Sequence, residues 1–199
     1  MGLTSTDATE LVEQLQHAHR ISVAFYRRIL PAFDTIAADL DLQFWYWEPS
    51  HTSMPGRRST RPSNSWAWDY IPLFASTHVY RRISGKVASP DDAVLSFCLY
   101  IDDAFSPENW KAKGINGQPD AVTMPMGNAV LQAYVSRPLE VADYTFEQLW
   151  EKTPDDVTGP TGQMQKIGEN MQAIGFEWAL ADVLIDTRPM LGTLRKHTE

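Results

Sequence analysis

The spacing of the apolar residues changes at Leu40, and this change limits the folds that the chain can adopt. Before Leu40, apolar residues recur at steps of three, four or sums of the two, which places them on one face of a helix. After Leu40 they recur with a period of two in several short segments, which is typical of strands. A long N-terminal helix followed by a sheet is therefore expected. The apolar positions of the helix are Leu11, Leu15, Ala18, Phe25, Ile29, Phe33, Ile36 and Leu40.

Acidic residues near its start and one proline in its interior predict where this helix begins and whether it is continuous. Asp7 followed by Glu10 predicts a capping pair at the N-terminus, and Glu13 adds negative charge where the helix dipole is positive. Pro31 has no backbone N–H to donate, so it is expected to kink or split the helix.

Four segments after Leu40 are predicted strands, three of them from an alternating pattern and 73–83 from its β-branched and aromatic residues. In the first, Phe44 and Tyr46 face one side and Trp45 and Trp47 face the other, so this strand needs cover on both sides. No helical crossover of the kind that parallel strands require separates the segments, which favours an antiparallel sheet. The segments are 42–48, 73–83, 92–102 and 128–137.

The C-terminal third supports two interpretations. Thr145 with Gln148 predicts a capping box at the start of a short helix. Steps of three and four from Met164 to Trp178 favour a further helix. Residues 174–186 also alternate with a period of two, so a final strand is an open alternative there.

These patterns predict an α+β fold in which a long N-terminal helix packs on a mainly antiparallel sheet of four or five strands, with one or two C-terminal helices. The 199 residues are expected to form a single domain. Long loops are expected at 49–65 and 106–127, where turn-forming residues are frequent.

Composition and charge narrow the classes of function. Residues 1–90 hold 8 acidic and 9 basic side chains, whereas residues 91–199 hold 17 and 8. This acidic balance argues against extended nucleic-acid binding. The single cysteine, Cys98, cannot form an internal disulfide. No run approaches the roughly 20 apolar residues of a membrane span, and the N-terminus lacks a signal-peptide pattern, so a cytoplasmic protein is expected.

The common catalytic and nucleotide-binding motifs do not occur in the sequence, so no cofactor is predicted. His17 and His19 would lie about 200° apart around the helix and cannot share one metal ion. His78 occupies an alternating strand position, which favours a packed residue over a catalytic base.

A cluster of carboxylates lies where the segment 92–102 ends. Asp102, Asp103 and Glu108 together could hold Mg²⁺ and support hydrolytic chemistry. Consecutive strand residues point to opposite faces, so Asp102 and Asp103 converge only if the chain turns between them. The alternative is that they are ordinary turn formers at a strand exit.

Residues 44–70 combine two aromatic clusters with a basic loop that carries no acidic residue between Glu48 and Asp69. If 66–74 is a strand, this loop lies at one end of the sheet. Guanidinium groups bind phosphates and carboxylates, and aromatic rings offer stacking partners. The alternative is a packed hairpin with a solvated tip. The residues of the predicted binding site are Arg57, Arg58, Arg61, Trp66 and Trp68.

The missing motifs and the basic, aromatic loop favour a non-enzymatic soluble binding or accessory protein. It would act through contact with a protein partner or an anionic ligand, and a homo-oligomer is compatible with this hypothesis. The alternative hypothesis is a metal-dependent hydrolase or nuclease-like enzyme that uses the carboxylate cluster.

Overall fold

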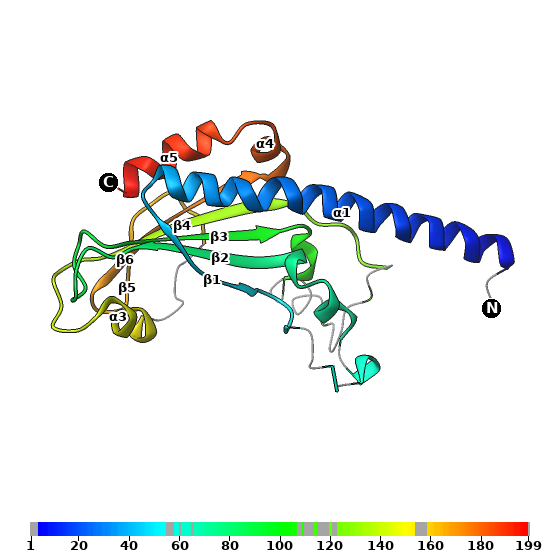
Figure 1. The fold of residues 1–199 in the computed structure, drawn as a ribbon, viewed down its shortest axis with the longest axis horizontal. Helices are drawn as coiled ribbons and strands as arrows, with labels where there is room; N and C mark the ends of the chain where they lie inside the picture. Colours follow the sequence, from blue (N-terminus) through cyan, green and yellow to red (C-terminus); the bar gives the residue numbers. More distant parts are fainter. Residues whose placement is uncertain are drawn as a thin grey trace.

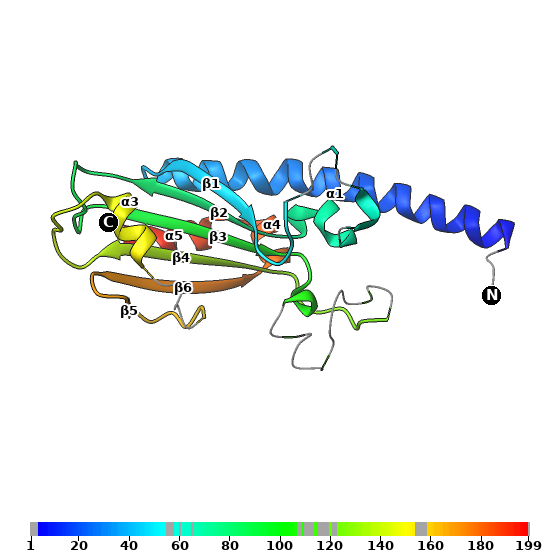
Figure 2. The same ribbon diagram turned by 90° about the horizontal axis from the view of Figure 1, so that it is seen from below.

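The computed structural model describes residues 4–198, with the exception of 55–57, 60, 65, 107–108, 110–113, 115–119, 121–122 and 154–158. The side chain of Trp68 also lies outside the described part. Over the described residues the chain forms a six-stranded antiparallel sheet with helices on both faces (Figures 1 and 2). The predicted α+β fold is confirmed, with more strands than expected. In sheet order the strands are β1 (Gln43–Pro49), β2 (Ala75–Arg82), β3 (Ala93–Tyr100), β4 (Val130–Pro138), β6 (Met171–Ala179) and β5 (Gln165–Ile167).

Three helices cover one face of the sheet, and a short helix lies on the other face (Figure 1). The first layer consists of α1 (Ser5–Asp39), α4 (Leu180–Ile185) and α5 (Arg188–Thr198). The opposite layer is α3 (Phe146–Lys152), which starts at the predicted capping box of Thr145 and Gln148.

Helix α1 begins at a different cap from the one predicted and is continuous through Pro31. Its N-cap is Thr4, whose hydroxyl accepts from the backbone N–H of Asp7, while the Asp7 carboxylate accepts from the N–H of Thr4. Pro31 removes one backbone hydrogen bond, but Ile29 and Phe33 on either side of it are buried against the sheet. This packing holds the helix together where the sequence predicted a break.

The main core lies between α1 and the sheet and is centred on a stack of two aromatic rings. Phe33 of α1 lies on Phe97 of β3 with ring centroids 4.6 Å apart and an interplanar angle of 12°. His78 of β2 lies between Phe33 and Trp47. Burial lowers the pKa of His78 to about 4, so the ring is neutral at pH 7. The packed residue expected at this position is therefore found.

A β-bulge in the edge strand β1 changes the predicted faces of its aromatic residues. Phe44 pairs with Tyr80 and Tyr46 with Val79, so Trp45 has no partner in the ladder. The extra residue places Trp45 and Tyr46 together among the residues packed toward α3. Strict alternation, which put them on opposite faces, is wrong here because a bulge shifts the period by one residue.

The C-terminal segment 174–186 contains both a strand and a helix. Strand β6 continues to Ala179, and α4 begins at Leu180. A hairpin turn at Gly168, whose φ of +60° suits glycine, brings β5 against β6. Because β6 also pairs with β4 along its whole length, sheet pairing overrides the helical spacing that starts at Met164. Residues 66–74, interpreted as a strand, instead contain two 3₁₀ helices, Ala67–Tyr70 and Pro72–Phe74.

Truncation of the central stack should be costly. We expect Phe33→Ala to lower the free energy of unfolding by about 3–5 kcal/mol, because it leaves a cavity against Phe97. Phe44→Ala is a matched control, since the Phe44 side chain is 54% exposed, and should cost much less. Urea unfolding of both variants measures the difference. Equal losses would show that the Phe33–Phe97 contact does not anchor the fold.

The neutral state of His78 should make stability depend on pH. Burial lowers its pKa from the ordinary 6.5 of histidine to about 4 in the folded protein, so its contribution to stability is complete above pH 6.5 and is lost as the pH falls toward 4. The loss should be roughly 3 kcal/mol. Replacing His78 with Gln should remove this part of the pH dependence, whereas His17→Gln, on an exposed part of α1, should leave it intact. Denaturant unfolding at several pH values checks this, and identical profiles for all three proteins would contradict it.

Candidate functional site

The structure describes part of the predicted basic site. Arg58 and Arg61 are exposed, and the Trp66 side chain is 40% exposed. Neither arginine forms an ion pair within the described part of the chain. The loop is closed by a hydrogen bond from the backbone N–H of Ser53 to the Asp69 carboxylate, 2.9 Å long. Arg57 and the Trp68 side chain lie outside the described residues, so the complete five-residue site stays a prediction.

The predicted carboxylate cluster lies at the end of β3, and its two described members accept hydrogen bonds from the backbone. Asp102 Oδ1 accepts from the N–H groups of Ala104 and Gly127, at 3.0 and 2.8 Å. Asp103 Oδ1 accepts from the N–H of Asn128 at 2.8 Å. Both carboxylates thereby tie the exit of β3 to the entry of β4.

Gly127 shows how tightly this corner is packed. A Cβ atom added there would collide with the carboxylate oxygens of Asp102 and Asp103 and with the backbone nitrogen of Ala104. The described residues contain no group of three side chains able to hold a metal ion. Glu108 lies outside the described residues, so the three-carboxylate hypothesis stays a prediction. The geometry that is described matches the alternative of turn formers.

Removal of the Asp102 carboxylate should therefore damage the fold. Asp102→Ala leaves two backbone donors without their acceptor, at an expected cost of about 1–3 kcal/mol in unfolding free energy. Asp143→Ala, at an exposed position, should change it by less than about 0.5 kcal/mol. Thermal unfolding with and without Mg²⁺ measures both effects. Stabilisation of the wild type by Mg²⁺ that Asp102→Ala abolishes would favour the metal site instead.

Two nucleophile candidates that sequence reasoning passed over are inaccessible. Ser76 Oγ lies 3.0 Å from His78 Nε2, a serine–histidine contact of the kind used in acyl transfer. Ser76 is completely buried beneath α1 and the sheet, so a substrate cannot reach its hydroxyl. Burial raises the pKa of the Cys98 thiol to about 11, which keeps it protonated and unreactive at neutral pH.

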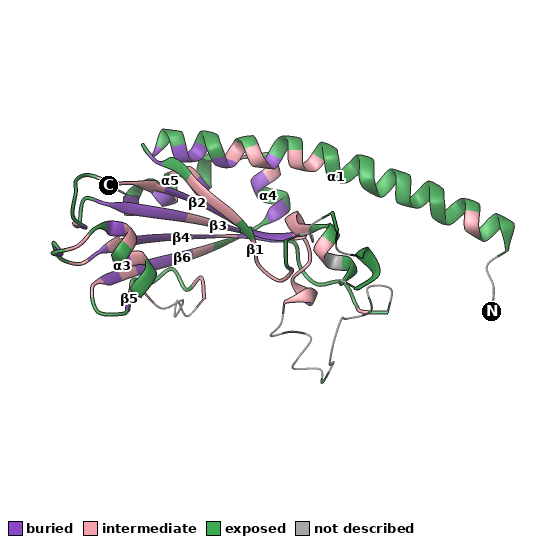
Figure 3. Cartoon of the chain, turned by 60° about the horizontal axis from the view of Figure 1, so that its bottom comes forward, coloured by how far each residue is buried: buried purple, intermediate pink, exposed green. Residues whose placement is uncertain are grey.

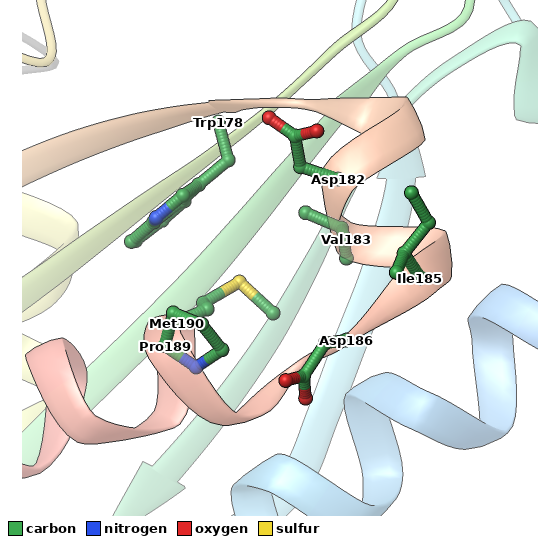
Figure 4. Close-up of a pocket in the computed structure, with 7 residues that line it drawn as sticks. All are labelled: Trp178, Asp182, Val183, Ile185, Asp186, Pro189 and Met190. Carbon is green, nitrogen blue, oxygen red and sulfur yellow. The ribbon is translucent and has the colours of Figure 1, made fainter.

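A shallow hollow lies between the end of β6, α4 and the start of α5 (Figure 4). Its volume is about 220 Å³, below the roughly 300–1,000 Å³ of typical ligand pockets. Trp178, Val183 and Met190 form its apolar wall, and the carboxylates of Asp182 and Asp186 lie at its edge. Asp186 is already engaged, since it pairs with Arg188 at 2.8 Å. This leaves little free chemistry to recognise a small molecule.

The N-terminal part of α1, residues 5–24, which we name the arm, exposes several large apolar residues close together in the sequence. It extends past the sheet as a free helical segment (Figures 1 and 2). All its residues except Ala8 are exposed, as the continuous exposed colouring of Figure 3 shows. Leu11 and Leu15 are 54% and 56% exposed. No described helix is both long and apolar enough to cross a membrane.

The arm exists because α1 is longer than the strands that it covers. A helix of 35 residues spans about 52 Å, whereas a strand of 8 residues spans about 27 Å. A signal for this extension is present in the sequence, since the apolar stripe is longer than any single predicted strand. The prediction of a long helix packed on a sheet did not take this difference in length into account.

Comparison with known proteins identifies one family. Residues 5–193 match the family model described as PM0109. No curated protein and no solved structure matches the chain. The match includes the arm together with the sheet and most of α5.

Proposed function

The chain belongs to the PM0109 family, and we propose that it is a non-enzymatic cytoplasmic binding protein that acts through contact with other protein chains. The observation that carries this proposal is the arm. Its apolar stripe lies on the same side of α1 as the buried stripe of Ile29 and Phe33, yet no described element covers it.

The arm carries five of the large apolar residues that the described part of the chain exposes. Leu11 and Leu15 are consecutive members of the stripe, and Val12, Ile21 and Val23 flank it, each more than half exposed. Contiguous apolar surface of this kind on a soluble protein marks an interaction site. Burial against a partner would contribute about 25 cal/mol for each Å² of apolar surface removed from water.

The arm also benefits from cover because an isolated helix is marginal in water. Most helical stability in proteins comes from tertiary packing of the apolar face rather than from helix propensity. Over the described residues, the arm is supported by its capping box and by its continuity with the packed part of α1, without cover on its apolar face. A partner on the stripe would supply the missing packing.

Charged substitutions in the stripe test this proposal. Combining Leu11→Glu with Leu15→Glu should abolish capture of partner proteins from a native lysate, because it places charges within the apolar surface. Thr9→Glu with Gln16→Glu adds the same charge at exposed positions away from the stripe, and should retain the same proteins. Both variants should keep the wild-type melting temperature. If both capture the same set as the wild type, the arm is not the binding surface.

An anionic ligand at the basic loop is a second candidate, favoured by the exposure of Arg58, Arg61 and Trp66. We expect the wild type to bind inorganic polyphosphate more weakly as salt rises, because exposed charges are screened over about 8 Å at physiological ionic strength. Alanine at Arg57, Arg58 and Arg61 together should abolish binding while changing stability by less than about 0.5 kcal/mol.

Alanine at three exposed lysines, Lys86, Lys166 and Lys196, is the matched control for the loss of three charges. This triple variant should bind polyphosphate almost as the wild type does. Fluorescence titration, followed by urea unfolding, compares the three proteins. Equal weakening in both triple variants would show a non-specific charge effect, and unfolding of the arginine variant would assign the loop a structural role.

A further inference from the structure

We infer that the occupant of the arm is the arm of a second copy of the chain, packed antiparallel as a two-helix coiled coil. The inference rests on the proposed function, because both assign the arm as the binding surface, and it goes further by naming the partner. Three observations carry it: the spacing of the stripe, the sizes of its residues and the distribution of charge along the helix.

The stripe of the arm follows the coiled-coil period. From Ala8 to Ile29 it advances in alternating steps of three and four, which averages 3.5 residues and suits a left-handed pair of helices. The step from the buried Ile29 to the buried Phe33 is a second consecutive step of four, so the alternation is interrupted once where the sheet covers the helix. The stripe residues are Ala8, Leu11, Leu15, Ala18, Ser22, Phe25 and Ile29.

Residue sizes along the stripe fit an antiparallel pair. When the arms run in opposite directions about a two-fold axis, Leu15 faces Ala18 of the second copy, and Leu11 faces Ser22. Each large side chain then enters the space left by a small one, as knobs-into-holes packing requires.

The outermost layer follows the same rule, with Ala8 facing the half-buried Phe25 of the second copy. A parallel pair would set each residue against its own copy, with small residues facing small ones. The cavities left where Ala18 faces Ala18 and Ser22 faces Ser22 of the second copy would lower the stability of a parallel dimer. Size therefore selects the antiparallel orientation.

Charge over residues 5–28 of α1 is segregated in the same sense, and the remaining acidic residues of the helix, Asp34 and Asp39, lie beyond this segment. In an antiparallel pair the acidic half of one segment lies beside the basic half of the other, whereas a parallel pair places like charges together. None of these charges occupies a stripe position, so they can favour one orientation without being buried. The acidic residues are Asp7, Glu10 and Glu13, and the basic ones are Arg20, Arg27 and Arg28.

Sedimentation equilibrium of the purified full-length chain at micromolar concentrations tests the partner. The wild type should be a dimer. Leu15→Glu should raise the dissociation constant by more than about tenfold, because it places a charge inside the apolar seam. Gln16→Glu adds the same charge at the neighbouring exposed position and should remain dimeric. A monomeric wild type, or a Leu15→Glu variant that dimerises normally, would overturn the inference.

The distance between two spin labels tests the orientation. A label on Thr6→Cys, in a Cys98→Ser background, should lie more than about 30 Å from its counterpart, because Thr6 then faces position 27 and each residue adds 1.5 Å along the helix. A parallel pair would bring the labels to about 20 Å, the width of two helices, because Thr6 lies on the side of each helix that faces away from the seam, and this would overturn the antiparallel assignment. Arm-dependent capture of other proteins by a monomeric wild type would overturn only the second copy as partner. Loss of all arm-dependent binding would overturn the proposed function as well.

Discussion

The difference in length between α1 and the sheet decides which apolar residues of α1 are buried and which are exposed to solvent. The apolar stripe of α1 is buried from Ile29 to Ala37 and exposed before Phe25. Where the sheet covers the stripe, the Phe33–Phe97 stack and the neutral His78 form a dry core. Where the sheet ends, the same pattern of residues becomes an arm that faces solvent. One helix therefore acts both as a core element and as the candidate interaction surface.

At the ends of the strands, several charged side chains are already engaged in hydrogen bonds or ion pairs within the protein. Asp102 and Asp103 accept backbone N–H groups, and Asp186 pairs with Arg188. A carboxylate engaged in this way has fewer lone pairs left for a metal ion or a substrate. Arg81 is similarly engaged, since it donates to Glu147 at 2.6 Å and lies over the Trp45 ring. Charged groups that remain exposed, such as Arg58 and Arg61, are better candidates for recognition.

Local periodicity predicted the fold well because helix and strand patterns arise from neighbouring residues. The long helix, the antiparallel strands β2, β3 and β4 and the capping box at Thr145 are confirmed, each from a short stretch of sequence. Predictions failed where distant residues decided the outcome. The bulge at Trp45, the continuity of α1 through Pro31 and the strand from Met171 all depend on pairing or packing with remote elements. For the candidate site, the sequence predicted the basic loop, and it predicted a long helix packed on the sheet without indicating that the N-terminal part of that helix stays exposed.

The sequence by itself determined which residues are apolar, how they are spaced and where charge accumulates, because these properties belong to the residues. It therefore determined a long amphipathic helix whose first turns are acidic, followed by an antiparallel sheet. Tertiary structure alone decided how much of that helix is covered, because coverage depends on the length and position of strands formed much later in the chain. The same physical rule, that apolar surface is buried when a neighbour is available, makes Phe33 a core residue and leaves Leu15 exposed.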